Sequence, residues 1–171
     1  SFSDFATERW KNEEVLMRGL LEDLGYEVIS AEANHDVKLQ NDQIDNMVSQ
    51  GVKGLIVVAE DGDAIVTSVD KAADAGVKVI AYDRLIRDSG SVDYYATFDN
   101  FKVGVQQATS LVEGLKERFP DVKPWNVELF GGSPDDNNAF FFYNGAMSVL
   151  QPMIDSKEIV IKSGQMGMEK V

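Results

Sequence analysis

Residues 54–83 read GLIVVAEDGDAIVTSVDKAADAGVKVIAYD, and this stretch decides the fold. Its first six residues form a nearly continuous apolar run, as a strand buried on both faces of a parallel sheet does. Apolar residues then recur at helical spacing over residues 65–75, and Gly76 is a typical helix terminator. A second apolar run follows at residues 77–82. Strand, helix and strand joined by short glycine-marked turns predict parallel strands with a right-handed crossover, and hence an α/β fold.

The same alternation extends in both directions along the chain. Two series of strands and helices lie on either side of residues 97–100, and no low-complexity linker separates them. The further predicted helices are residues 10–24, a helix marked by Ile44, Met47 and Val48 that ends at Gly51, residues 101–119 and residues 137–150; the further predicted strands are residues 26–31, 94–98, 126–130 and 159–163.

Both series are expected to be incomplete. A strand should precede the first helix, yet residues 1–5 are too short and polar for a whole strand. At the other end the sequence stops at Val171, just after a predicted strand and without a helix to cover it. We therefore expect a truncation at each edge.

The composition excludes several classes of function. Sixteen Lys and Arg residues stand against 29 Asp and Glu residues, a formal charge of -13, which argues against nucleic acid and anionic lipid as partners. The chain has no cysteine, so disulfides, thiolate metal sites and cysteine nucleophiles are excluded. No apolar run approaches the ~20 residues of a membrane-spanning helix, so direct membrane insertion is not expected.

Polar side chains gather in four loops that follow predicted strands. Open α/β sheets bind ligands beyond the carboxyl ends of their strands. The four loops hold Glu8 to Trp10, Glu60 with Asp61, Asp83 with Arg84, and the motif GGSPDDNNA at residues 131–139.

These loops combine the groups that a pyranose sugar needs. Asp83 accepts hydrogen bonds from hydroxyls, while Arg9 and Arg84 carry fixed forks of donors. Asn137 and Asn138 each offer a donor and an acceptor, and Trp10 offers a flat apolar face for the sugar ring. Each residue also has a simpler interpretation: Trp10 in the core, Asp83 with Arg84 as a surface ion pair, and one of the two asparagines as a helix cap.

Motifs of catalysis are missing from the sequence. GGSPDDNNA lacks the spacing of phosphate-binding loops, and no nucleophile elbow occurs. The only histidine, His35, is expected in solvent, and the acidic pairs Asp61 with Asp63 and Asp135 with Asp136 are expected in turns and caps rather than at Mg²⁺. We therefore predict a binding protein with no catalytic residue, no metal and no cofactor.

Several segments together are recognisable. They are ERW at residues 8–10, QIDNMVSQGVKGLIVV at 43–58, VIAYDRLIRDSG at 79–90, YYATFDNFKVG at 94–104, LFGGSPDDNNAFFF at 129–142 and KSGQMGM at 162–168. The chain resembles the periplasmic sugar-binding proteins of ABC transporters, in the ribose-, galactose- and xylose-binding group, and is most similar to the xylose-binding and multiple-sugar-binding receptors. The resemblance covers essentially the whole chain, and AYDRLI and GGSPDDNNA together are quite specific.

The resemblance implies a type I periplasmic binding protein fold, with two Rossmann-like parallel-sheet lobes joined by a hinge and a monosaccharide in the cleft between them. Residues 1–98 would be the N-terminal sugar-binding lobe with its first strand largely missing, and residues 99–171 a partial C-terminal lobe. By motif position, the ligand-binding residues would be Arg9, Trp10, Asp83, Arg84, Asn137, Asn138, Gln165 and Met166.

The resemblance also implies the biological setting. The protein would be periplasmic or extracellular, associated with the membrane through transporter subunits or a lipid anchor. It would deliver a sugar of the xylose, glucose or galactose type to an ABC transporter, with a chemoreceptor as a possible second partner. Two alternatives stay open at this point: a sugar-sensing subunit of a membrane histidine kinase system, and the effector-binding domain of a sugar-responsive transcriptional regulator.

Overall fold

The computed structural model describes residues 1–171, and these form two compact units, Ser1–Ala96 and Thr97–Val171. The division falls two residues before the predicted end of the first lobe at residue 98. In the first unit the elements are α1 (Glu8–Asp23), α2 (Val37–Ser49), β1 (Gly54–Val57), α3 (Val66–Asp74), β2 (Lys78–Tyr82) and β3 (Tyr94–Ala96). In the second they are α4 (Asn100–Arg118), β4 (Trp125–Val127), α5 (Asn137–Asp155) and β5 (Ile159–Ile161).

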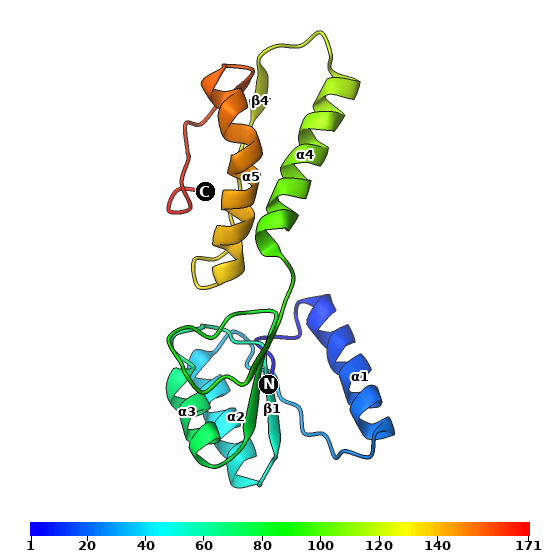
Figure 1. Ribbon diagram of the computed structural model, residues 1–171, viewed down its shortest axis with the longest axis vertical. Coiled ribbons are helices and arrows are strands. Elements are labelled where there is room, and N and C mark those ends of the chain that lie inside the picture. Colours follow the sequence, from blue (N-terminus) through cyan, green and yellow to red (C-terminus); the bar gives the residue numbers. More distant parts are fainter. The chain divides into compact units, whose positions relative to one another are not determined.

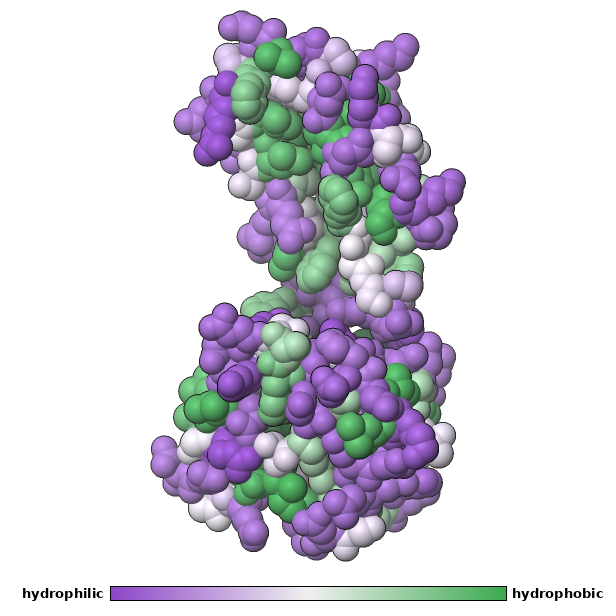
Figure 2. All heavy atoms as spheres, turned by 180° about the vertical axis from the view of Figure 1, so that it is seen from behind, coloured by the Kyte–Doolittle hydropathy of each residue, from purple (hydrophilic) through white to green (hydrophobic).

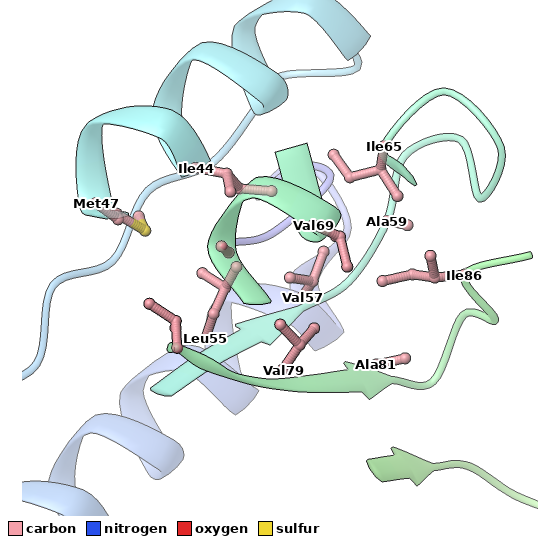
Figure 3. Close-up of a cluster of buried hydrophobic side chains, with 12 residues drawn as sticks. Ile44, Met47, Leu55, Val57, Ala59, Ile65, Val69, Val79, Ala81 and Ile86 are labelled. Atoms are coloured by element: carbon pink, nitrogen blue, oxygen red, sulfur yellow. The ribbon is translucent and has the colours of Figure 1, made fainter. Parts of the chain in front are cut away.

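The first unit is built on a parallel sheet in the order β1-β2-β3. Leu55 of β1 stands opposite Val79 of β2, and Ile80 of β2 opposite Tyr94 of β3. Helices α2 and α3 pack on one face of this sheet (Figure 1), where the side chains of β1 and β2 meet those of the helices (Figure 3). This core confirms the predicted strand–helix–strand unit and its parallel crossover.

One predicted strand of the first unit is wrong. Residues 26–31 form no strand; an isolated parallel bridge joins Phe2 to Glu32, one residue beyond the predicted range. A strand needs a neighbouring strand to supply its hydrogen bonds, and the backbone pairing with Phe2 begins only at Ala31 and continues to Ala33. Instead, the side chain of Arg18 holds this segment, donating to the Val28 carbonyl at 3.0 Å and to the Ser30 hydroxyl at 2.8 Å.

A hollow of about 740 Å³ lies beside β1 in the first unit. Its apolar lining includes Met17 and Leu21 of α1, Ile29, and Ile56 and Ile80 of the sheet. Helix α1 therefore buries little of its own surface, and Trp10 is its only fully buried residue. The face of β1 opposite α2 and α3 is only partly covered, whereas the sequence predicted burial on both faces.

The second unit pairs β4 with β5 in parallel, with Trp125 opposite Ile159. Its two long helices pack closely, because Gly104 of α4 and Gly145 of α5 let the backbones approach each other. The predicted strand at 126–130 begins one residue earlier and ends at Val127. Helix α5 runs five residues past its predicted end and continues through Pro152. Proline cannot make the backbone hydrogen bond of a helix, but the packing of Met153 and Ile154 against the core offsets this loss.

Hydrophilic residues cover most of the visible face of the first unit, and hydrophobic residues appear there only in small separate groups (Figure 2). None of the helices combines the length and the apolar character that crossing a lipid bilayer takes.

Candidate functional site

Arg9 and Asp83 form the centre of the candidate site in the first unit. Arg9 stands near the start of α1 and Asp83 directly after β2, and Arg9 Nη2 donates to Asp83 Oδ2 at 2.7 Å. The Asp83 side chain is one-tenth exposed, whereas that of Arg9 is 42% exposed. The pair therefore keeps donors of the guanidinium at the surface, beside a carboxylate whose position is fixed.

The backbone around Asp83 is held by β3. Asp83 has a positive φ of 63°, a conformation that Asp tolerates better than most side chains. Its backbone N–H donates to the Ala96 carbonyl at 2.7 Å, and the Tyr95 hydroxyl donates to the Asp83 carbonyl at 3.1 Å. Both contacts orient the carboxylate beyond the carboxyl end of the sheet, as the sequence predicted for this loop.

Arg84 is anchored to the neighbouring strand-end loop. Its Nη1 donates to the Ala59 carbonyl at 3.1 Å and lies 3.6 Å from Glu60 Oε2. These contacts bring the second and third predicted loops together at one edge of the sheet. Arg84 is therefore more than a solvated surface residue, and about a fifth of its side chain is exposed.

Sequence reasoning missed Glu13, which positions Arg9. Glu13 Oε1 accepts from Arg9 Nε at 2.7 Å, one helical turn further along α1. Partial burial lowers the pKa of Arg9, but hydrogen bonds with Glu13 and Asp83 outweigh this effect and raise the pKa above its ordinary value. Burial, together with the nearby Glu13 carboxylate, also raises the pKa of Tyr82. The Arg–Glu spacing of four residues on a helix is the signal that could have found Glu13.

Trp10 lies in a hydrophobic cluster rather than at the surface. It is 5% exposed and packs with Phe2 and Val58. The Arg9 guanidinium lies over its ring, 4.3 Å from the centroid. This placement matches the core interpretation of Trp10, and stacking of its ring on a sugar stays a prediction.

Of the predicted residues in the second unit, Asn137 and Asn138 are the first two residues of α5. Neither is the helix cap that the sequence suggested. Asp136 caps α5, because its carboxylate accepts from the Asn138 backbone N–H at 2.9 Å. The buried Asn138 side chain accepts from Asn100 Nδ2 at 2.8 Å, so Asn100 is a second residue that sequence reasoning missed.

Gln165 and Met166 follow β5 in the second unit. Gln165 is exposed, and Met166 packs against the core of this unit. Their roles as ligand-binding residues stay predictions.

The acidic pairs behave as turn and cap residues, as predicted. Asp61 accepts from the backbone N–H groups of Asp63 and Ala64, and these hydrogen bonds lower the pKa of Asp61. Asp136 is the α5 cap described above. In the arrangement that remains, the Arg9 guanidinium lies on the Asp83 carboxylate and the Arg84 guanidinium lies beside Glu60 in the neighbouring loop. Such donors and acceptors are suited to hydroxyl-rich ligands.

Comparison with known proteins identifies the family. The model of the periplasmic binding protein domain matches residues 4–170. The chain belongs to the periplasmic binding protein family. Its parallel sheets and its match to solved members confirm the type I fold predicted from the sequence.

Periplasmic binding proteins with known ligands are among its relatives. The multiple sugar-binding periplasmic receptor ChvE of Rhizobium radiobacter is 56% identical over 97% of this chain and 47% of its own length. The D-xylose-binding periplasmic protein of Escherichia coli is 39% identical over 96% of this chain and 48% of its own. An ABC transporter solute-binding protein from Clostridium phytofermentans, solved with bound β-D-glucose, superposes with a TM-score of 0.93 at 44% identity, covering 99% of this chain and 52% of its own. The chain thus spans about half the length of these periplasmic binding proteins.

Proposed function

We propose that the protein binds a monosaccharide of the xylose, glucose or galactose type. The observation that carries this proposal is the Arg9–Asp83 pair, with Arg84 beside it, at the carboxyl edge of the sheet in a member of the periplasmic binding protein family. Asp83 Oδ2 accepts from Arg9, and a carboxylate is an acceptor suited to sugar hydroxyls. The similarity to receptors named for multiple sugars and D-xylose supports this ligand class.

The partners follow from the same proposal. The sugar is released unchanged to the membrane subunits of an ABC transporter, with a chemoreceptor as a further partner. The named relatives are periplasmic proteins, which supports the same compartment here and association with the membrane through the transporter. They are receptors and binding proteins by name, which supports a role without catalysis.

Titration calorimetry with D-xylose, D-glucose, D-galactose, L-arabinose and D-ribose tests this proposal. Because the chain spans about half the length of its relatives, the product of the complete gene is titrated alongside the 171-residue chain. Saturable heat with at least one sugar is expected. A folded complete protein that binds none of the five would overturn the proposal, as would conversion of the sugar to a product.

Asp83→Asn is expected to weaken sugar binding by roughly 10- to 100-fold, because hydrogen bonds to a charged group are worth about 1.5–3 kcal/mol. Arg9→Lys is expected to have an effect of similar size, since an ammonium cannot reproduce the two-sided hydrogen bonding of Arg9 to Glu13 and Asp83. Titration of both variants measures the effect. Asp74→Asn, an exposed residue of the same unit with the same change of charge, serves as the control. Equal affinities of Asp83→Asn and Asp74→Asn would contradict the assigned role.

A further inference from the structure

Three potential metal ligands from distant parts of the sequence meet in the first unit, next to the loops described above. They are Asp4, which precedes α1, His35, which precedes α2, and Glu60, which follows β1. One ligand atom from each lies within 4.8 Å of the others. His35 Nδ1 lies 3.2 Å from Glu60 Oε1, and His35 Nε2 lies 3.8 Å from Asp4 Oδ2.

Asp4 is the unusual member of this group. It is 1% exposed, and Asp83 is the only other carboxylate among the fully buried residues. Asp83 pairs with Arg9, whereas the only basic side chain near Asp4 is the His35 imidazole. The Asp4 carboxylate accepts from the Thr7 backbone N–H at 2.6 Å and from the Ser3 hydroxyl at 3.2 Å. A carboxylate removed from water in this way is stabilised by a nearby positive charge, and no Lys or Arg supplies one.

The chemistry of the three groups fits a divalent transition metal. One imidazole nitrogen and two carboxylate oxygens are ligands that Zn²⁺ takes at about 2.0–2.2 Å, which sets ligand atoms of a tetrahedral ion roughly 3.4 Å apart. In the structure one ligand atom from each of the three side chains lies within 4.8 Å of the others, so small side-chain movements bring them to this spacing. A single imidazole nitrogen must bind the ion, so the ring has to turn, and a side chain that is 56% exposed is free to do so.

The Glu60 carboxylate also lies beside Arg84. Its Oε1 and Oε2 lie 3.2 and 3.3 Å from His35 Nδ1, and Oε2 also lies 3.6 Å from Arg84 Nη1. Metal binding through Oε1 is therefore compatible with the contact between Glu60 and Arg84.

We propose that Asp4, His35 and Glu60 form a binding site for a divalent cation of the Zn²⁺ type, with water completing the coordination. The site uses residues distinct from the Arg9–Asp83 pair. It stands whether or not the protein binds a sugar.

The test is titration of the chelator-treated protein with ZnCl₂ at about pH 7.5, where histidine side chains are ordinarily neutral. Calorimetry gives the stoichiometry, and the NMR signals of the imidazole report the ligand directly. Because His35 is the only histidine, these signals need no assignment. One equivalent of Zn²⁺ is expected to shift them in parallel with the heat.

His35→Gln and Glu60→Gln are each expected to weaken Zn²⁺ binding by at least about tenfold. Both side chains reach the surface, so neither substitution should unfold the chain, which circular dichroism checks. Glu27→Gln makes the same change of charge as Glu60→Gln at an exposed position outside the group and should leave binding unchanged. The proposal is overturned if the wild-type protein shows no saturable binding, or if His35→Gln binds as tightly as the wild type.

Discussion

Gly145→Ala is expected to unfold the second unit, Thr97–Val171, while the first unit stays folded. A Cβ atom at Gly145 would lie 2.0 Å from the carbonyl oxygen of Phe101 and 3.0 Å from the backbone nitrogen of Val105. Both are backbone atoms of α4, so no side-chain rotation relieves the overlap. Helices α4 and α5 would have to separate along their whole contact, and the packing of the unit would be lost with it.

The expected size of this effect approaches the whole stability of the unit. Overpacking of a core costs about 1–3 kcal/mol where side chains can adjust, and more where the backbone has to move. A unit of this length is stable by roughly 4–10 kcal/mol in total. We therefore expect a loss of about 4 kcal/mol or more from one added methyl group.

Hydrogen exchange measured by mass spectrometry separates the two units. Peptides from residues 97–171 should lose their protection in Gly145→Ala, and peptides from residues 1–96 should keep theirs. Gly114→Ala is the matched control on α4, because a Cβ atom there meets nothing within 4 Å. This control should gain about 1 kcal/mol, since alanine is the better helix former. Similar protection of the second unit in both variants would show that the close approach of α4 and α5 does not matter.

The alternation of strands and helices could be predicted because each element is marked by its own residues. The apolar runs at 54–59 and 77–82 became β1 and β2, and α2 and α3 end just before Gly51 and Gly76, both with positive φ. Such signals are local, and they fix where an element begins and ends. The strand predicted at 26–31 failed for the opposite reason, because a strand depends on a neighbour that its own sequence does not contain.

In the candidate site, too, the position of a residue in the fold could be predicted from the sequence, whereas its contacts with distant residues could not. The contact of Arg9 with Asp83 joins residues 74 positions apart. The sequence placed both residues in loops at the carboxyl ends of strands, where open α/β sheets bind ligands, but it did not predict that they touch. The rule places residues at an edge and does not say which of them touch. The spacing of four residues from Arg9 could have indicated Glu13, whereas Asn100 and the meeting of His35 with Asp4 appear only in the structure.

An apolar strand added before Ser1 is expected to fill the hollow beside β1 and to stabilise the first unit by several kcal/mol. The backbone of Ser1 already pairs with β1, since its nitrogen donates to the Ile56 carbonyl at 2.8 Å and its carbonyl accepts from Val58 at 2.9 Å. Phe2 pairs on its other side with Ala31 and Ala33. Residues added before Ser1 would continue between these two segments, along a hollow lined by Met17, Leu21 and Ile80.

Two effects add to this stabilisation. The first is burial of the added side chains, worth about 1.5–3 kcal/mol for each fully buried Val or Ile, less the entropy of ordering the strand. The second is removal of the buried charge at Ser1, because an extension turns its ammonium into an amide. In the 171-residue chain, burial lowers the pKa of the Ser1 ammonium to about 5.

The buried ammonium also predicts a pH dependence. The ordinary pKa of this group is 8.0, so between pH 5 and pH 8 the unfolded chain binds more protons than the folded chain. The free energy of unfolding therefore rises with pH across this interval, by on the order of 3 kcal/mol. Chains extended at Ser1 should lose this rise.

Urea unfolding of three chains separates burial from charge: the 171-residue chain, one extended by about five apolar, β-branched residues, and one extended by as many alternating Gly and Ser residues. The polar extension removes the charge alone, so it should flatten the pH dependence and add little more at pH 8. The apolar extension should in addition exceed the polar one by about 3 kcal/mol at every pH. If both extensions give equal stabilities, no strand enters the hollow. If the pH dependence survives them, it originates elsewhere than at the Ser1 nitrogen.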